Sequence, residues 1–421
     1  MSISISMSAS ASASVLPRDL LEAVTTLYLD LHAHPELSGE ESRTAACFAD
    51  WLTRAGYRVT AGVGGHGVVG LLENGEGPLV VVRAELDALP VQERTGLPYA
   101  SRVSTPVPVM HACGHDLHLA AAAGAASVLA ADRRLWRGTV MVVGQPAEET
   151  LSGAQAMLDD GLHDRFGRPD AVLAQHAAPL PAGMVAHGTG PMTAGSVSLD
   201  VVVHGRGGHV ATPHLAVDPV VTAAAVVVRL QTMVAAETAP AEQVVLTVGR
   251  LQAGTRGNVI PDRAELGLTV RGFSGAALDR VVTAVHRIVR AECDASGCPV
   301  PPEISVVSRS PVNRPDPQLT AAIRDAHAAA FGEARVTGWP PSMATEDFPL
   351  LAPDGVPTAY WMLGTAGPRQ WAAAPGTTAA EKLAGLPPNH SPLFAPSPRL
   401  ALPTGITAMV TAARAALGSP S

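Results

Sequence analysis

The amino-acid sequence predicts an α/β protein whose chain is interrupted by a second, α+β domain. Strand-length apolar runs alternate with helical patterns before residue 190, which is typical of a largely parallel sheet covered by helices. From residue 190 the strands instead alternate apolar and polar residues, as half-buried strands do. The chain is also 421 residues long, which is more than one ordinary compact domain contains.

The first domain is predicted to begin with two helices, over residues 20–31 and 40–55, where apolar residues recur at helical spacing. Apolar runs then predict buried strands at 67–73, 79–86, 139–145 and from 171, with an Ala-rich helix over 117–129. In such sheets, ligand sites gather at the carboxyl ends of the strands. The polar residues that follow these runs are therefore candidates for a functional site.

Residues 190–308 are predicted to form an inserted, lid-like domain. Its elements have the order β-α-β-β-α-β, with strands at 196–205, 242–252, 264–273 and 302–308 and helices at 219–234 and 277–291. The chain then returns to the first domain, with helix 319–331, strand 358–364 and helix 403–417. The first domain is therefore expected to contain residues 17–189 and 309–421.

The composition excludes several classes of protein. Hydrophobic residues make up 47% of the chain, the net charge is −8, and no basic run is present, so nucleic acid is not expected as a partner. No apolar run approaches the roughly 20 residues that a membrane span needs. The protein is therefore predicted to be soluble and cytoplasmic, without a membrane partner.

Residues 1–16 are predicted to be a disordered tail. Ser alternates there with small or apolar residues, without the basic start or continuous apolar segment of a signal peptide. Met7 is an alternative start to Met1.

Four cysteines are too few for a disulfide framework in a chain of this length, and Cys293 and Cys298 are interpreted as incidental thiols.

The densest group of candidate ligands lies in the segment HACGHDLH at 111–118. It contains His111, Cys113, His115, Asp116 and His118. Imidazole and thiolate groups bind borderline-soft divalent metals, and two-residue spacing places Cys113 and His115 on one side of an extended segment. A polar loop with an incidental thiol is the alternative. A metal takes few protein ligands, so some of these residues would only orient the others.

Three further segments contain candidate site residues. Glu148 and Glu149 follow the strand at 139–145; beside a metal, one carboxylate can bind it while the other moves a proton. His176 ends the apolar run from 171, and His390 lies in a loop between two prolines. Each feature alone is also explained by a solvated carboxylate pair or a structural histidine. Together with the cluster at 111–118, they favour a binuclear metal site.

The inserted domain contains its own candidates. His209 ends a glycine-rich segment that lets the backbone approach closely, and it is suited to donate to a developing oxyanion. Arg271 ends a predicted strand, and its guanidinium suits a carboxylate, with a surface salt bridge as the alternative. Asn258 follows a glycine and is by default a turn residue.

The assembled segments resemble the M20 metallopeptidase family, and within it the N-acyl-amino-acid amidohydrolases, which include hippurate hydrolases and auxin-conjugate hydrolases. The similarity runs from about residue 31 to residue 392, and nine segments follow the family's order. They are LHAHPELSGEE (31–41), RAELDALPVQE (83–93), MHACGHDLH (110–118), QPAEE (145–149), QHAAPLPAG (175–183), GRGGHVATPH (205–214), GNVIP (257–261), SMATEDF (342–348) and NHSP (389–392).

The resemblance implies a zinc-peptidase-like catalytic domain and a ferredoxin-like lid that often forms a homodimer. It implies that two divalent metal ions, from among Zn, Mn, Co and Ni, are bound by Cys113, His115, Glu149, His176 and His390. Glu148 is then the general base, which deprotonates the metal-bound water and protonates the leaving amine. His209 and Asn258 steady the oxyanion, with His209 a candidate for supply by the partner subunit, and Arg271 and Asn258 bind the substrate.

The chain departs from this branch of the family in two places: mildly at Ala344 and Thr345, where the branch usually has a pair of small residues, and at residue 85, behind the ligands. The branch usually has Asp-x-Asp before Ala-Leu-Pro, whereas this chain has Glu85 and Asp87. Asp87 and Asp116 are expected to support the ligands without binding metal. The change at residue 85 leaves the ligand set intact but alters its surroundings.

The sequence therefore predicts a metal-dependent amidohydrolase that cleaves N-acyl amino acids to a carboxylic acid and an amino acid. The nearest alternative is a metallo-carboxypeptidase or dipeptidase that uses the same site. More remote alternatives are a Cys113-dependent acyl hydrolase with His115 as base, and a non-catalytic binding protein that keeps the fold.

Overall fold

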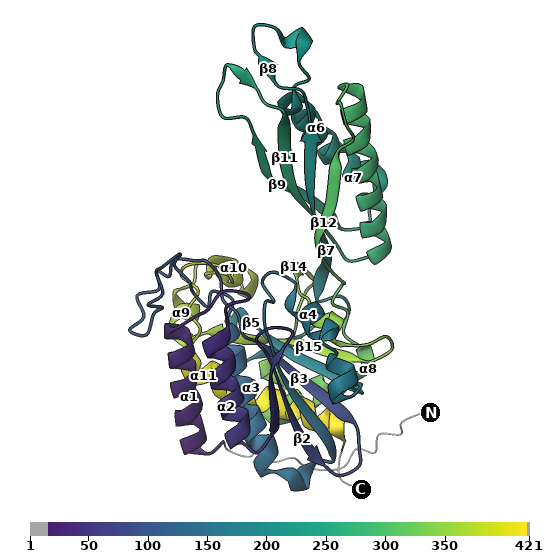
Figure 1. Cartoon of the computed structure of the whole chain (residues 1–421). Helices are drawn as coiled ribbons and strands as arrows, with labels where there is room; N and C mark the ends of the chain where they lie inside the picture. Colours follow the sequence, from purple (N-terminus) through teal and green to yellow (C-terminus); the bar gives the residue numbers. More distant parts are fainter. Residues whose placement is uncertain (1–15, 419–421) are drawn as a thin grey trace. The chain divides into compact units, whose positions relative to one another are not determined.

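The computed structural model describes residues 16–418, so the predicted disordered tail falls outside the described residues apart from its last one (Figure 1). The described chain divides into two compact units. The first unit contains the residues up to 190, residues 315–340 and those from 351 onward, and the second contains 191–314 and 341–350. The predicted inserted domain did not include 341–350, where strand β14 (Ser342–Thr345) pairs with β7 (Thr193–His204).

The first unit is built on one mixed sheet. Its strands are β1 (Arg58–Val63), β2 (Gly67–Asn74), β3 (Leu79–Glu85), β4 (Gly138–Gln145), β5 (Ala171–Pro181), β6 (Val185–His187), β13 (Val336–Gly338) and β15 (Thr358–Ala366). They lie in the order β1-β2-β4-β3-β5-β15-β6-β13. The central strands β4, β3, β5 and β15 are parallel, whereas β1, β2 and β6 have antiparallel neighbours. The predicted parallel sheet is confirmed at its centre.

Helices cover this sheet. They are α1 (Arg18–Ala33), α2 (Ser42–Arg54), α3 (His115–Ala131), α4 (Gly153–Asp159), α5 (Leu162–Phe166), α8 (Pro317–Phe331), α9 (Pro368–Ala373), α10 (Ala379–Gly385) and α11 (Pro398–Leu417). The Ala-rich α3 packs against α1 and α11 and is buried on nearly all sides (Figure 1). It begins after Gly114, whose φ of 84° favours glycine, and a Cβ there would lie 2.9 Å from the Ala177 side chain.

The second unit is a five-stranded sheet with two helices on one face: four strands are antiparallel, and the short β14 pairs parallel with β7. Its strands β7, β9 (Val244–Ala253), β11 (Arg263–Gly272) and β12 (Glu303–Ser310) lie in the order β12-β7-β11-β9. The helices α6 (Pro219–Glu237) and α7 (Gly275–Ala295) are capped by the side chains of Asp218 and Ser274. The short strands β8 (Gly208–His209) and β10 (Val259–Ile260) form a separate pair. The predicted β-α-β-β-α-β order is confirmed.

Two helices are longer and more apolar than the sequence analysis recognised. By length and composition, α6 and α11 would each be able to span a membrane. The sequence prediction counted uninterrupted apolar runs and therefore missed both. Most of α11 is buried in the first unit, and α6 packs one face on the sheet of the second unit. Core helices of soluble proteins have these same properties, so the two helices are weak support for a membrane span.

Candidate metal centre

The first unit brings six predicted site residues together at the carboxyl ends of its central strands. Cys113 and His115 lie at the start of α3, His176 lies on β5, the two glutamates follow β4, and His390 lies in the loop before α11. Three overlapping groups have ligand atoms within 4.8 Å of one another: Cys113, His115 and His176; Cys113, Glu149 and His390; and His115, Glu148 and Glu149. Residues far apart in the chain thus meet at one point.

Hydrogen bonds determine which nitrogen of each imidazole is free. His115 Nδ1 lies 2.9 Å from the Asp87 backbone oxygen and 3.1 Å from Asp87 Oδ1, so Nδ1 carries the proton. His115 Nε2 is buried without a hydrogen-bond partner among residues 16–418. His176 Nδ1 donates to the Ala177 oxygen (3.0 Å), which leaves its Nε2 3.5 Å from Cys113 Sγ. Both rings direct Nε2 into the cluster, as metal-ligating histidines do.

Glu149 and His390 complete the cluster. The Glu149 N–H donates to Asp87 Oδ2 (2.9 Å), and its buried Oε1 has no hydrogen-bond partner in the described chain. Glu149 Oε2 lies 3.4 Å from His390 Nε2. The Cys113 and Glu149 side chains raise the pKa of His390 to about 10. The Cys113 and Glu149 side chains that stabilise the proton on His390 would also attract a divalent cation, which would displace that proton from the ring.

Burial and neighbouring charges set the protonation of the other histidines. Desolvation by the surrounding protein lowers the pKa of His176 to about 3, so its ring is neutral, which is the form that binds a metal. Burial also acts to lower the pKa of His115, but the Asp87 carboxylate and the Cys113 thiol raise it well above its usual value. Burial acts to raise the pKa of Asp87, but the hydrogen bond and charge of His115, with the hydrogen bonds from Glu149 N–H and Ser38, together hold that pKa below its usual value. Asp87 therefore orients a ligand as a carboxylate.

The turn that carries the two glutamates is strained and supported from a distant part of the chain. Ala147 and Leu151 have φ values of 49° and 54°, although neither is glycine. The buried Glu41 Oε1 accepts the N–H groups of Ala147 and Gly39, both at 2.8 Å. In the sequence, Glu41 is marked only as the last residue of the segment 31–41, and no residue spacing indicates its role.

The other members of the segment 111–118 have different surroundings. Asp116 Oδ2 lies 2.6 Å from the buried His32 Nδ1 and, against the effect of burial, raises the pKa of His32 to about 10. This pair joins α1 to α3. His118 uses both ring nitrogens in hydrogen bonds. His111 is buried, which lowers its pKa to about 4, and its nitrogens have no hydrogen-bond partner within residues 16–418.

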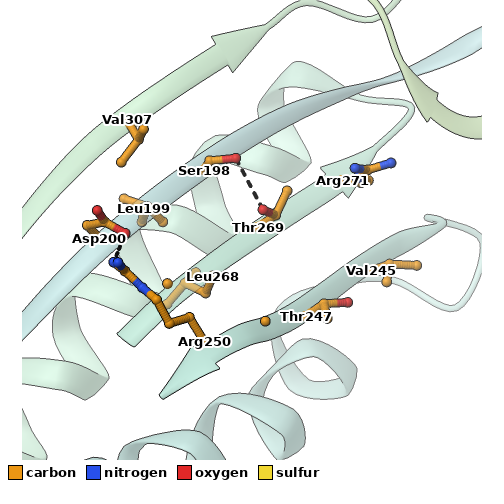
Figure 2. A pocket seen from close by; sticks show the side chains of 12 residues that line it. Ser198, Leu199, Asp200, Val245, Thr247, Arg250, Leu268, Thr269, Arg271 and Val307 are labelled. Carbon is orange, nitrogen blue, oxygen red and sulfur yellow. Dashed lines mark hydrogen bonds and ion pairs between the residues drawn. The ribbon is translucent and has the colours of Figure 1, made fainter. Parts of the chain in front are cut away.

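The second unit holds the three remaining predicted residues. Val259 pairs with His209, so His209 and Asn258 lie on neighbouring segments, and both are exposed. The Ala211 N–H donates to His209 Nδ1 (3.0 Å), which leaves the Nε2–H as a donor. Arg271 lies on β11, where its Nη1 donates to the Met343 oxygen (2.9 Å). Figure 2 shows Arg271 on the open face of the sheet, where it lines a groove of about 430 Å³.

The donor set fits divalent metal ions. Thiolate sulfur, imidazole nitrogen and carboxylate oxygen are the ligands of zinc and related metals, and two of the ligand atoms are buried without a hydrogen-bond partner in the described part of the chain. The fold and this cluster define a hydrolase of the metal-dependent type. Residues 81–382 match the model of peptidase family M20/M25/M40, and the chain belongs to this family. It is therefore a hydrolase that acts on amide bonds.

Named relatives extend over most of the chain. An N-acetyl-L-cysteine deacetylase of Bacillus subtilis is 35% identical over 81% of this chain and 80% of its own length. A thermostable carboxypeptidase 1 of Saccharolobus solfataricus is 30% identical over 90% and 91%. A solved structure is also similar: the YXEP protein of Bacillus subtilis, described as a dinuclear metal binding peptidase from the M20 family. The similarity has a TM-score of 0.74 and 28% sequence identity, and it covers 96% of this chain and all of that one. The resemblance to this family, and to its branch of N-acyl-amino-acid hydrolases, is confirmed.

Proposed function

We propose that the protein hydrolyses N-acyl amino acids at a site with two divalent metal ions, and that it releases a carboxylic acid and a free amino acid. The observation that supports this best is that His115 Nε2 and Glu149 Oε1, buried ligand atoms without a hydrogen-bond partner within residues 16–418, lie 3.8 Å apart in a chain of an amide-hydrolase family. The deacetylase relative favours an acyl amino acid as substrate. The carboxypeptidase relative keeps a peptide substrate as the rival.

Five side chains of the first unit would hold the metals: Cys113, His115, Glu149, His176 and His390. Cys113, His115 and Glu149 each belong to two of the ligand groups, so the five side chains would hold the metals as one connected set. Zn, Mn, Co and Ni all suit mixed sulfur, nitrogen and oxygen donors. When bound, such ions polarise the scissile carbonyl and make water more acidic.

Glu148 is proposed to move the proton. Its side chain is nearly buried, with Oε2 3.8 Å from Nε2 of the ligand His115. The Glu148 carboxylate accepts a proton from the attacking water as the water oxygen bonds to the acyl carbon. It then returns that proton to the amide nitrogen as the C–N bond breaks, so the amine leaves neutral.

The second unit is proposed to recognise the substrate. The His209 Nε2–H and the Asn258 side-chain amide are exposed donors on neighbouring segments, which suits an oxyanion. Asn258 also belongs to the proposed substrate contacts. Arg271 keeps further guanidinium donors beyond the one used on Met343, and these suit the carboxylate of an amino acid.

We also propose that two copies associate through the second unit. Val221 and Val228, on one side of α6, are 65% and 66% exposed, and β9 is an edge strand of its sheet. An apolar helix face beside an unpaired strand edge is suited to pairing with a second copy.

The four cysteines are free thiols, which supports a reducing, cytoplasmic location.

The test combines metal analysis of the purified protein with a substrate panel. We expect chelation to abolish hydrolysis, Zn, Mn, Co or Ni to restore it, and N-acetyl and N-benzoyl amino acids to be cleaved faster than dipeptides. Faster cleavage of dipeptides would favour the peptidase alternative. An acyl group trapped on Cys113 in chelated, active protein would favour the thiol hydrolase.

A further inference from the structure

A buried cation and its partners connect three elements that carry proposed ligands. Arg83 on β3 donates through Nε to Gln145 Oε1 at the end of β4 (2.8 Å), and through Nη1 to Glu85 Oε1. Glu85 Oε2 lies 2.8 Å from His118 Nδ1 on α3. The N–H of Ala177 on β5 donates to His118 Nε2 (2.7 Å). The four side chains of this chain of hydrogen bonds have no exposed surface.

The hydrogen bonds of His118 and Glu85 show which atoms donate and which accept at the centre of this hydrogen-bond network. Because His118 Nε2 accepts the Ala177 N–H, the proton of the neutral ring lies on Nδ1, which donates to Glu85. His118 thus has no lone pair left for a metal, although it lies among candidate ligands. Each carboxylate oxygen of Glu85 has its own partner, Arg83 or His118. Removing any member would leave a buried polar group unpaired.

Each end of this hydrogen-bond network lies next to a proposed metal ligand. Gln145 directly precedes the turn that carries Glu149, and Ala177 directly follows His176. His118 lies one helical turn after His115, and its ring also packs edge-on against the His176 ring, with centroids 4.8 Å apart. The Arg83 network therefore reaches the backbone or the ring next to three ligands that come from three different elements.

We propose that Glu85 and His118 are positioning residues that set the spacing of the metal ligands on α3, β5 and the turn after β4. This inference rests on the proposed metal centre. It also gives a physical reason for a glutamate at residue 85, which contacts both Arg83 and His118. An aspartate is one methylene shorter, about 1.5 Å, so its carboxylate would not reach both Arg83 and His118 from the same backbone position.

Two substitutions at His118 separate its two contacts. His118→Gln keeps an acceptor for the Ala177 N–H, because the Gln amide reaches the Nε2 position. His118→Asn keeps a donor for Glu85, because the Asn amide reaches the Nδ1 position. If the contact to β5 positions His176, His118→Asn lowers Co²⁺ affinity by about 10- to 100-fold and changes the visible Co²⁺ absorption spectrum. His118→Gln stays much closer to the unchanged protein in both measurements.

Hydrogen exchange of the metal-free protein gives a second measurement. Amide exchange of the segment 174–180 should rise in His118→Asn and stay low in His118→Gln. Ser127→Ala is the matched control: it removes a hydrogen bond on α3 to Trp51, away from the network, and should leave Co²⁺ binding unchanged. If His118→Asn does not fold, His118→Ala replaces it: it also lacks an acceptor for the Ala177 N–H, so the same loss of Co²⁺ affinity is expected. Glu85→Asp tests the contact that His118→Gln also breaks, so both of these variants should lose less Co²⁺ affinity than His118→Asn.

The outcomes are distinct. Co²⁺ affinity and spectrum unchanged in His118→Asn, or equal effects of the Asn and Gln variants, would overturn the positioning role. Failure of the unchanged protein to bind two Co²⁺ ions would instead refute the proposed metal centre. The exchange measurement would then still decide whether His118 holds the backbone of β5.

Discussion

His187 and His327 form a buried pair that should make the first unit sensitive to acid. His327 Nε2 donates to the Ala408 oxygen (2.9 Å), so its Nδ1 accepts the proton of His187 Nε2 at 3.0 Å. This arrangement needs a neutral His327, whose Nδ1 must keep its lone pair, and burial also disfavours a charge on the His187 ring. Burial lowers the pKa of His187 to about 3 and that of His327 to about 4.

The pKa values give the size and sign of the effect. Both lie below the value of about 6.5 for an unfolded histidine, so the unfolded chain binds more protons as the pH falls below 6.5. The stability that depends on neutral rings is present above pH 6.5 and is lost progressively toward pH 4. At pH 5 each histidine lowers the free energy of unfolding by about 2 kcal/mol relative to pH 8, or about 4 kcal/mol for the pair.

The double variant His187→Phe, His327→Leu replaces both histidines with apolar groups, so no buried imidazole is left without its partner. Urea unfolding at pH 8 and pH 5 measures the free energy of unfolding, and fluorescence reports on Trp361, whose ring lies 5.3 Å from that of His327. Other buried histidines titrate in both proteins, so the difference between them isolates this pair. Equal pH dependence in the two proteins would refute the reasoning.

Three further predictions concern the site and its surroundings. Asp87→Asn removes the charge that faces His115 and should lower metal affinity about 10- to 100-fold in a chelator competition, whereas unchanged affinity would show that Asp87 does not support the ligands. Gly153→Ala places a Cβ 1.6 Å from the Pro146 oxygen and should lower the melting temperature and the turnover, while Gly190→Ala, with no atom within 4 Å, should change neither. Val228→Asp should shift the protein to monomers in sedimentation, and an unaltered dimer would place the interface elsewhere.

Much of the fold is predictable from local patterns because its elements are long and strongly periodic. The apolar run at 79–86 became β3, and the alternation after residue 190 became the sheet of the second unit. The three-residue strands β6 and β13 escaped prediction, because they are too short to show a period and are defined by their neighbours in the sheet. The start of α11 was placed at Pro403, although Pro398 occupies the first turn and Pro403 is accommodated inside the helix.

In the candidate site, too, the residue types were predictable from the sequence, whereas their contacts were not. Motifs named the proposed ligands, since residue type and spacing carry that information. They did not show which nitrogen of His115 or His176 is free, because the tautomer follows from the folded geometry: His115 contacts the sequence-distant Asp87, and the ring of His176 turns back onto the carbonyl of the next residue, Ala177. Nor did they identify the support from Glu41 or Arg83. Both are buried charges whose partners lie tens of residues away in the chain.

We propose that the metal-dependent site hydrolyses N-acyl amino acids with Glu148 as the proton carrier. Steady-state turnover of an N-acyl amino acid by metal-loaded Glu148→Gln tests it most directly, with metal content measured on the same sample. We expect the metal content to be unchanged and kcat to fall by about 10²- to 10⁴-fold, because the amide cannot accept and return the proton. Turnover equal to that of the unchanged protein, at equal metal content, would contradict the account.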